Sequence, residues 1–240
     1  MEKLTRSFLI GFDRYVQLDW CHSTLEAAVG RKSIDEVKEQ ISLVLTGAES
    51  TRKTFDILKR LWLQPLPDCI DFSKRGVEIF GKNETGLASP LSWGSAMVTY
   101  PFFGKTAEIT GRLFSIQGDC SIKEVQRRMA EIYGDRDGIA RAVSRVLQSQ
   151  ENWGMIERVE NGKRLIRKPP MTISDERVVT WLIEAVIRYT GTGVSLAKLQ
   201  SMPVLYPFIF DQSLAYAVSS SKKLELRSEG VGGQFVALAE

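Results

Sequence analysis

Residues 121–168 carry the clearest pattern in this chain, and they read SIKEVQRRMAEIYGDRDGIARAVSRVLQSQENWGMIERVENGKRLIRK. Ser121 is followed three positions later by Glu124, the spacing of a capping box, in which a hydroxyl and a carboxylate bind backbone N–H groups at a helix start. The pattern therefore predicts a helix that begins after Ser121. Its apolar stripe consists of Ile122, Val125, Met129 and Ile132, with Lys123, Arg127 and Arg128 outside it.

A second helix is predicted from Asp137 to Ser149, after a tight turn at residues 134–137 of the length that helix-turn-helix units use. At about 100° per residue, its apolar and polar residues separate onto two faces. The apolar face consists of Ile139, Val143, Val146 and Leu147. The opposite face consists of Arg141, Ser144, Arg145 and Gln148. These polar side-chain types reach the phosphates and base edges of DNA, arginine to guanine and glutamine to adenine.

A β-hairpin is predicted next, because Asn161-Gly162 separates residues 153–160 from residues 163–168. Asn-Gly is the strongest short hairpin signal, since both central positions of the tight turn need positive φ. The tip and the return strand carry Lys163, Arg164, Arg167 and Lys168. These cations are placed to contact a flanking backbone or minor groove.

With a further helix predicted over Lys105–Phe114, residues 105–168 resemble the winged helix-turn-helix superfamily. The resemblance implies that the helix from Asp137 enters the major groove of duplex DNA and that the hairpin, the wing, lies on the adjacent groove. The DNA-binding residues expected on this basis are Arg127, Arg128, Arg136, Arg141, Ser144, Arg145, Gln148, Lys163, Arg164, Arg167 and Lys168. Many winged helices contact only protein, so a protein-interaction module stays open.

Residues 169–240 form a looser copy of the same pattern. A helix opens at Ser174, a short helix opens at Ser195, and a third helix is predicted over residues 210–220 before another hairpin. The stretch 202–210 is apolar and contains proline, which is unusual for a helix-turn-helix turn, and the third helix carries no arginine on its outer face. We expect this module to mediate dimerisation or partner docking, with weaker DNA contact through Lys222, Lys223 and Arg227.

Residues 1–104 predict a helical N-terminal domain, with helices near 7–29, 33–45 and 50–62. Ser33 and Glu36 repeat the capping-box spacing. Residues 33–63 could form an extra helix-turn-helix with a basic outer face or a helical bundle with solvated charges, and both interpretations stay open. Trp93 and the Tyr100-Pro-Phe-Phe cluster are predicted to pack in the core or between domains.

The basic excess of the chain lies in its middle segment. Residues 105–168 carry 13 basic and 9 acidic side chains, whereas residues 1–104 carry 13 of each and residues 169–240 carry 6 and 7. The net charge of +3 therefore comes from the segment with the clearest motif, which favours a nucleic-acid partner.

Several other classes of protein are disfavoured. No run of eighteen apolar residues or signal sequence is present, so we expect a cytoplasmic protein without a membrane partner. Cys21, Cys69, Cys120 and His22 form no zinc-ligand pattern, so no metal is expected. Gly104-Lys105-Thr106 lacks the upstream glycine of a phosphate-binding loop, because Thr99 stands there. No catalytic constellation is visible, so we expect neither a cofactor nor enzymatic activity.

The sequence as a whole predicts a mainly α protein with small β-hairpin wings, in which a helical domain precedes tandem winged helix-turn-helix modules. Its expected function is to bind duplex DNA without chemistry, as a regulator or as the DNA-engaging subunit of a larger complex. The alternative is a scaffold subunit that binds protein partners. Trp93-Gly, Tyr100-Pro-Phe-Phe, Gly111-Arg-Leu and Trp153-Gly-Met-Ile also resemble small bacterial proteins of phage-defence operons.

Overall fold

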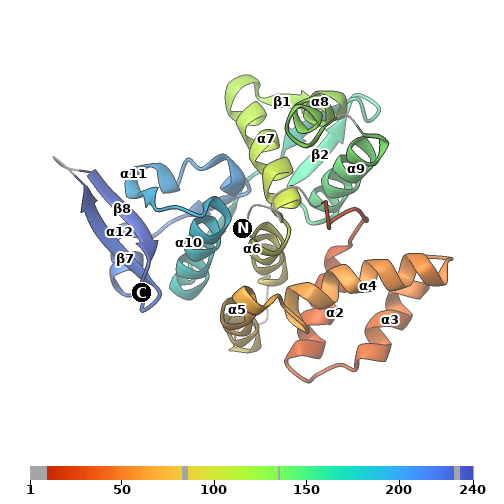
Figure 1. Ribbon diagram of the computed structural model, residues 1–240, viewed down its shortest axis with the longest axis horizontal. Helices are drawn as coiled ribbons and strands as arrows, with labels where there is room; N and C mark the ends of the chain where they lie inside the picture. Colours follow the sequence, from red (N-terminus) through yellow and green to blue (C-terminus); the bar gives the residue numbers. More distant parts are fainter. Residues whose placement is uncertain (1–9, 83–85, 135, 230–232, 240) are drawn as a thin grey trace.

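The computed structural model describes residues 10–82, 86–134, 136–229 and 233–239. Within these ranges the chain is mainly helical (Figure 1), as the sequence predicts. The α-helices are α2 (Leu18–Ala28), α3 (Ile34–Ser42), α4 (Ala48–Trp62), α5 (Ile70–Lys82), α6 (Ala88–Thr99), α7 (Pro101–Gln117), α8 (Ile122–Tyr133), α9 (Asp137–Asn152), α10 (Glu176–Thr190), α11 (Leu196–Leu199) and α12 (Leu214–Ser219). Short 3-10 helices are η1 (Pro67–Cys69) and η2 (Pro203–Leu205).

The described strands form three small sheets. They are β1 (Asp119–Ser121), β2 (Ile156–Val159), β3 (Arg164–Arg167), β4 (Met171–Ile173), β5 (Val194–Ser195), β6 (Phe208–Phe210), β7 (Leu224–Glu229) and β8 (Gly233–Leu238). Two of the sheets are antiparallel, with strand orders β1-β3-β2 and β5-β8-β7, and in the third β4 pairs with β6 in parallel.

Helices α2, α3 and α4 pack against one another at the N-terminal end of the molecule (Figure 1). The predicted capping box at Ser33 is confirmed, because the Ser33 hydroxyl and the Glu36 carboxylate each accept a backbone N–H. The predicted helix over residues 7–29 is wrong in its first part, since α2 begins only at Leu18 and residues 10–17 are not helical. The backbone N–H of Val16 donates to Ser149 Oγ of α9, and not to a backbone carbonyl one turn earlier as it would in a helix.

Helix α6 lies at the centre of the fold, between the N-terminal helices, α7 and α10 (Figure 1). Close approach to α10 requires Gly94, because a Cβ added there would lie 2.4 Å from the Trp181 ring. Trp93 is fully buried, as predicted, and its Nε1 donates a hydrogen bond to the Val204 carbonyl at 3.0 Å. Its ring meets aromatic rings of Phe103, Trp153, Tyr206 and Phe208 edge-on.

Residues 101–167 form a helix, a strand, two helices and a hairpin in that order. Helix α7 begins at Pro101, four residues before the predicted Lys105, because proline suits the first turn of a helix. Ser121 accepts the backbone N–H of Glu124 at 3.1 Å, which confirms the hydroxyl half of the predicted capping box. The Glu124 carboxylate instead accepts a hydrogen bond from Gln117 Nε2 at 3.0 Å. The predicted hairpin also forms, but Val159 pairs with Arg164, and the connection therefore has four residues instead of two.

The C-terminal residues repeat this strand arrangement, since β5-β8-β7 has the same chain order as β1-β3-β2. The predicted third helix is shorter than expected, because Phe210 belongs to β6 and α12 begins at Leu214. The apolar stretch 202–210 packs on α7, where a Cβ added at Gly111 would lie 2.0 Å from the Pro203 carbonyl oxygen. Its apolar, proline-containing sequence therefore serves packing between the two units.

Buried hydrophobic side chains of the described residues form one cluster that runs from Phe12 to Val236. It draws on each of the segments 1–104, 105–168 and 169–240. The surfaces of these segments are consequently held in a fixed relation to one another.

Candidate nucleic-acid interface

Helix α9 separates into the two faces that its sequence predicts. Ile139, Val143, Val146 and Leu147 are buried. Arg141 and Arg145 are exposed on the opposite side, and Ser144 and Gln148 are partly exposed. Because α9 packs on α8 and on α7, its buried face is fixed and its arginine face points outward.

The two arginines of this outward face remain available to a ligand. Arg145 Nη1 donates to Gln148 Oε1 at 2.9 Å, which holds both side chains along the helix without neutralising the guanidinium. Arg141 makes no hydrogen bond or ion pair with a described residue. A phosphate or base edge could therefore reach either guanidinium without displacing a carboxylate of the described residues.

Ser144 is occupied by a contact between the two helices. Gln126 Nε2 of α8 donates to Ser144 Oγ at 3.0 Å and to the Ala140 carbonyl at 2.9 Å. The Ser144 hydroxyl in turn donates to the Ala140 carbonyl at 3.1 Å. The structure thus ties Ser144 to the α8–α9 packing, with a partner, Gln126, that the sequence analysis did not single out.

The predicted arginines of α8 and of the turn after it are already engaged. Arg127 pairs with Glu131, and Arg128 lies 3.6 Å from Glu124, each pair one helical turn apart. Arg136 donates to the Tyr133 carbonyl at 2.9 Å and keeps its charge without a carboxylate among the described contacts. A DNA phosphate that bound Arg127 or Arg128 would therefore compete with the carboxylate of Glu131 or Glu124.

The hairpin presents Lys163, Arg167 and Lys168 to solvent at its turn and at the end of β3. None of the three has an ion-pair partner among the described residues. Arg164, in contrast, forms a bidentate pair with Asp119 of β1. Hydrogen bonds from Arg164 lower the pKa of Asp119, so this arginine joins two strands of the sheet.

The segment before α2 lies along one flank of α9. Leu18 N donates to Asn152 Oδ1 at 2.7 Å, Trp153 Nε1 donates to the Val16 carbonyl at 2.9 Å, and Ile10 approaches Gly138. Arg141 and Arg145 nevertheless stay exposed. The described part of the N-terminal segment therefore borders the arginine face without covering it.

Three further points concern metal ligands, membrane-spanning helices and the Gly104-Lys105-Thr106 motif. No group of three or more metal-ligating His, Cys, Asp or Glu side chains comes together in them. None of their helices combines the length and the apolar character that crossing a bilayer demands. Gly104-Lys105-Thr106 lies inside α7, where Gly104 packs against the Tyr189 ring.

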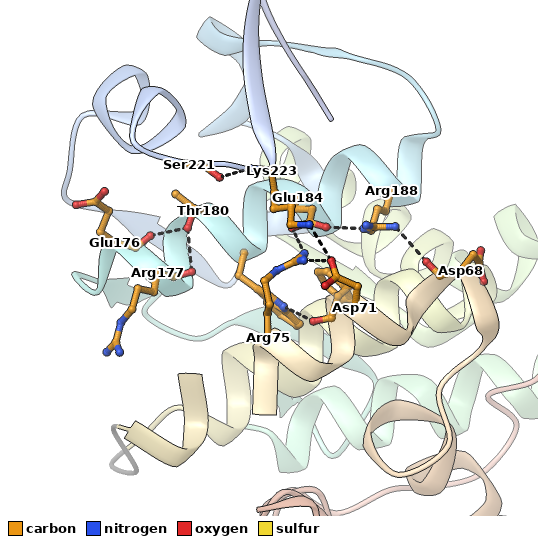
Figure 2. A network of polar contacts seen from close by, with 12 residues as sticks. Asp68, Asp71, Arg75, Glu176, Arg177, Thr180, Glu184, Arg188, Ser221 and Lys223 are labelled. Atoms are coloured by element: carbon orange, nitrogen blue, oxygen red, sulfur yellow. Dashed lines mark hydrogen bonds and ion pairs between the residues drawn. The ribbon is translucent and has the colours of Figure 1, made fainter. Parts of the chain in front are cut away.

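A polar network that no local sequence pattern predicts joins α5 and α10 (Figure 2). Glu184 is buried, and its carboxylate binds Arg75 at 2.5 Å and Arg188 at 2.7 Å. Arg75 also pairs with Asp71, which binds Lys223 at 3.1 Å. Glu184 interrupts an apolar helix stripe in the sequence, but its partner Arg75 lies 109 positions away, beyond the reach of a local pattern.

Comparisons of this chain with protein-family models, with curated proteins and with solved structures found no match. The geometry of the site must therefore carry any functional conclusion.

Proposed function

We propose that this chain is a non-enzymatic duplex-DNA-binding protein, acting as a regulator or as the DNA-engaging subunit of a larger complex. In this proposal α9 enters the major groove, and the β2–β3 hairpin contacts the backbone beside it. Arg141, Arg145 and Gln148 approach base edges and phosphates, whereas Lys163, Arg167 and Lys168 approach phosphates only.

The order of the elements supports a winged helix-turn-helix interpretation of residues 101–167. Helix α7, strand β1, helices α8 and α9, and the hairpin follow one another as that superfamily implies, and the hairpin pairs with β1 through β3. The corresponding C-terminal unit has no arginine on α12. We therefore assign the main DNA contact to the first unit.

One observation carries the proposal: Arg141 and Arg145 are exposed, one helical turn apart, on the outward face of a helix whose other side is buried. Arginine at this spacing gives phosphate and guanine a bidentate partner on a rigid element. The hairpin adds Lys163, Arg167 and Lys168, which are exposed and have no ion-pair partner among the described residues.

The test replaces both arginines by glutamate and measures fluorescence anisotropy of a labelled mixed-sequence duplex across a salt series. The wild-type chain should bind with a log–log salt slope of about −3 to −6, since each displaced counterion adds nearly one to the slope. Arg141→Glu/Arg145→Glu should abolish that binding. The matched control, Lys74→Glu/Lys198→Glu, changes the net charge equally at exposed positions on α5 and α11 and should retain it.

Two results would contradict the proposal. Equal loss of binding in the control pair would mean that overall charge, not the α9 face, supports the interaction. Failure of the wild-type chain to bind any duplex at low salt would remove DNA as the ligand.

The second candidate is a scaffold role, in which the tandem units bind protein, with a homodimer as the simplest assembly. The C-terminal unit favours it, because Tyr216 of α12 is 61% exposed on a helix face without cations. We propose that this unit serves assembly even where the first unit binds DNA. If the wild-type chain fails to bind duplex, the scaffold role accounts better for both units.

A further inference from the structure

A groove of about 330 Å³ lies between α5 and α10, on the part of the fold that carries the Glu184 network (Figure 2). Arg75, Ile79 and Lys82 face it from α5, and Arg177 and Trp181 face it from α10. The turn at residues 221–223 also lines it. This volume is within the range of small-molecule sites, which begins near 300 Å³.

The groove carries an excess of positive charge. Its lining cations are Arg75, Lys82, Arg177, Lys222 and Lys223, and its lining carboxylates are Glu78 and Glu184. Asp71 pairs with Arg75 and Lys223, and Asp175 pairs with Arg177, so the excess of positive charge rests on Lys82 and Lys222. Glu184 is satisfied by Arg75 and Arg188, because a buried carboxylate requires paired donors. That pairing holds Arg75 in place.

Two lysines of the groove are free to bind an anion. Lys82, at the end of α5, and Lys222, in the turn before β7, are exposed and form no ion pair with a described residue. They come from elements 140 positions apart in the chain, so the fold alone brings them to one opening. Lysine ammonium groups are common phosphate ligands.

Ile79 and Trp181 give the groove an apolar part, and Trp181 is held in place by its neighbours. Trp181 stacks on Phe72 with ring centroids 4.2 Å apart, and its Nε1 donates to the Phe72 carbonyl at 3.0 Å. Ile79 lines the groove as well. A ligand that fits must therefore join an anionic group to a flat or apolar part.

We propose that this groove binds a small organic phosphate of the size of a nucleoside monophosphate. The phosphate lies between Lys82 and Lys222, and the remainder of the ligand covers Ile79 and the edge of Trp181. None of the residues that line the groove belongs to α9 or to the β2–β3 hairpin, so the site is separate from the α9 face. The proposal does not depend on DNA binding by the chain.

The experiment titrates the full chain with AMP, GMP, CMP, UMP and inorganic phosphate in a calorimeter. At least one nucleotide should bind with one-to-one stoichiometry, and it should bind about tenfold more tightly than phosphate, because apolar contact adds to the charge interaction. Lys82→Ala/Lys222→Ala should weaken that nucleotide about tenfold or more, since each lost charge-assisted bond costs affinity. Lys74→Ala/Lys198→Ala, which removes exposed lysines outside the groove, should leave the affinity unchanged.

Three results would overturn the proposal. They are the absence of saturable binding by all four nucleotides, equal affinity for nucleotide and inorganic phosphate, and unchanged nucleotide affinity in Lys82→Ala/Lys222→Ala. Circular dichroism of each variant verifies that it is folded. Duplex-DNA affinity of Lys82→Ala/Lys222→Ala should fall by no more than the weak contact expected of Lys222 and stay well above that of Arg141→Glu/Arg145→Glu, which separates failure at this groove from failure of the DNA proposal.

Discussion

Gly111 shows how one missing side chain sets the distance between two units of the fold. It lies in α7 where the helix meets the chain at Pro203, and a Cβ there would come within 2.0 Å of a backbone carbonyl oxygen. A backbone atom cannot move aside as a side chain can. Gly111→Ala should therefore lower the free energy of unfolding by ~1–3 kcal/mol, as overpacking does, in urea denaturation followed by circular dichroism.

Gly138 provides the control for that substitution. It lies in α9, and the nearest atom to an added Cβ is 3.9 Å away. Gly138→Ala should leave stability unchanged or raise it by about 0.5–1 kcal/mol through helix propensity. Equal destabilisation by the two substitutions would show that contact with Pro203 is not the cause.

Ser144 allows structural and DNA-contacting roles to be separated at a single residue. Ser144→Ala removes the acceptor of one Gln126 hydrogen bond, so stability should fall by about 0.5–1.5 kcal/mol. Duplex affinity in the anisotropy assay should stay the same, because the hydroxyl is already engaged inside the protein. A marked loss of affinity with unchanged stability would assign Ser144 to the DNA contact instead.

At the scale of elements, α7 and α10 are joined by a polar link at Glu108. The Tyr189 hydroxyl donates to Glu108 Oε2 at 2.7 Å, and Lys105 lies 2.6 Å from the same oxygen. Partial burial raises the pKa of Glu108, but the hydrogen bonds from Lys105 and Tyr189 outweigh it and leave the pKa below its ordinary value of 4.5. The ionised carboxylate is thus favoured in the folded state.

This link predicts a pH dependence of stability. A carboxylate with a lowered folded-state pKa stabilises the fold above pH 4.5, the value for the unfolded chain, and loses that effect as the pH falls through the folded-state pKa. Glu108→Gln should therefore be less stable than wild type at neutral pH, and the difference should shrink in acid. Urea denaturation of both proteins over this pH range makes the comparison, and a constant difference would contradict the prediction.

Across the whole molecule, the features that could be predicted from sequence are those that neighbouring residues determine. The caps at Ser33 and Ser121, the hairpin near Asn161 and the faces of α9 each depend on spacings of a few residues. Cap chemistry, turn geometry and helical periodicity act at that range.

The features that escaped prediction join distant parts of the chain. Residues 10–17 read as helical, but their backbone binds α9 more than 130 positions away. The apolar stretch 202–210 is unusual for a helix-turn-helix turn, and its sequence does not reveal its role because its partners on α6 and α7 lie about 100 positions earlier. The groove lysines, likewise, are ordinary surface residues until the fold brings α5 and the 221–223 turn together.

The contact of Val16 and Leu18 with the end of α9 also has a consequence for biosynthesis. Ser149 follows Val16 by 133 residues, so at ~5–20 residues per second the ribosome needs on the order of ten seconds to deliver it. During that interval Phe12, which is fully buried in the finished fold, lacks its ring contact with Trp153, although its other aromatic neighbours Tyr100 and Phe103 are synthesised earlier. The segment around Val16 can therefore reach its final place only after α9 has been synthesised, because Ser149 and Trp153 bind its backbone.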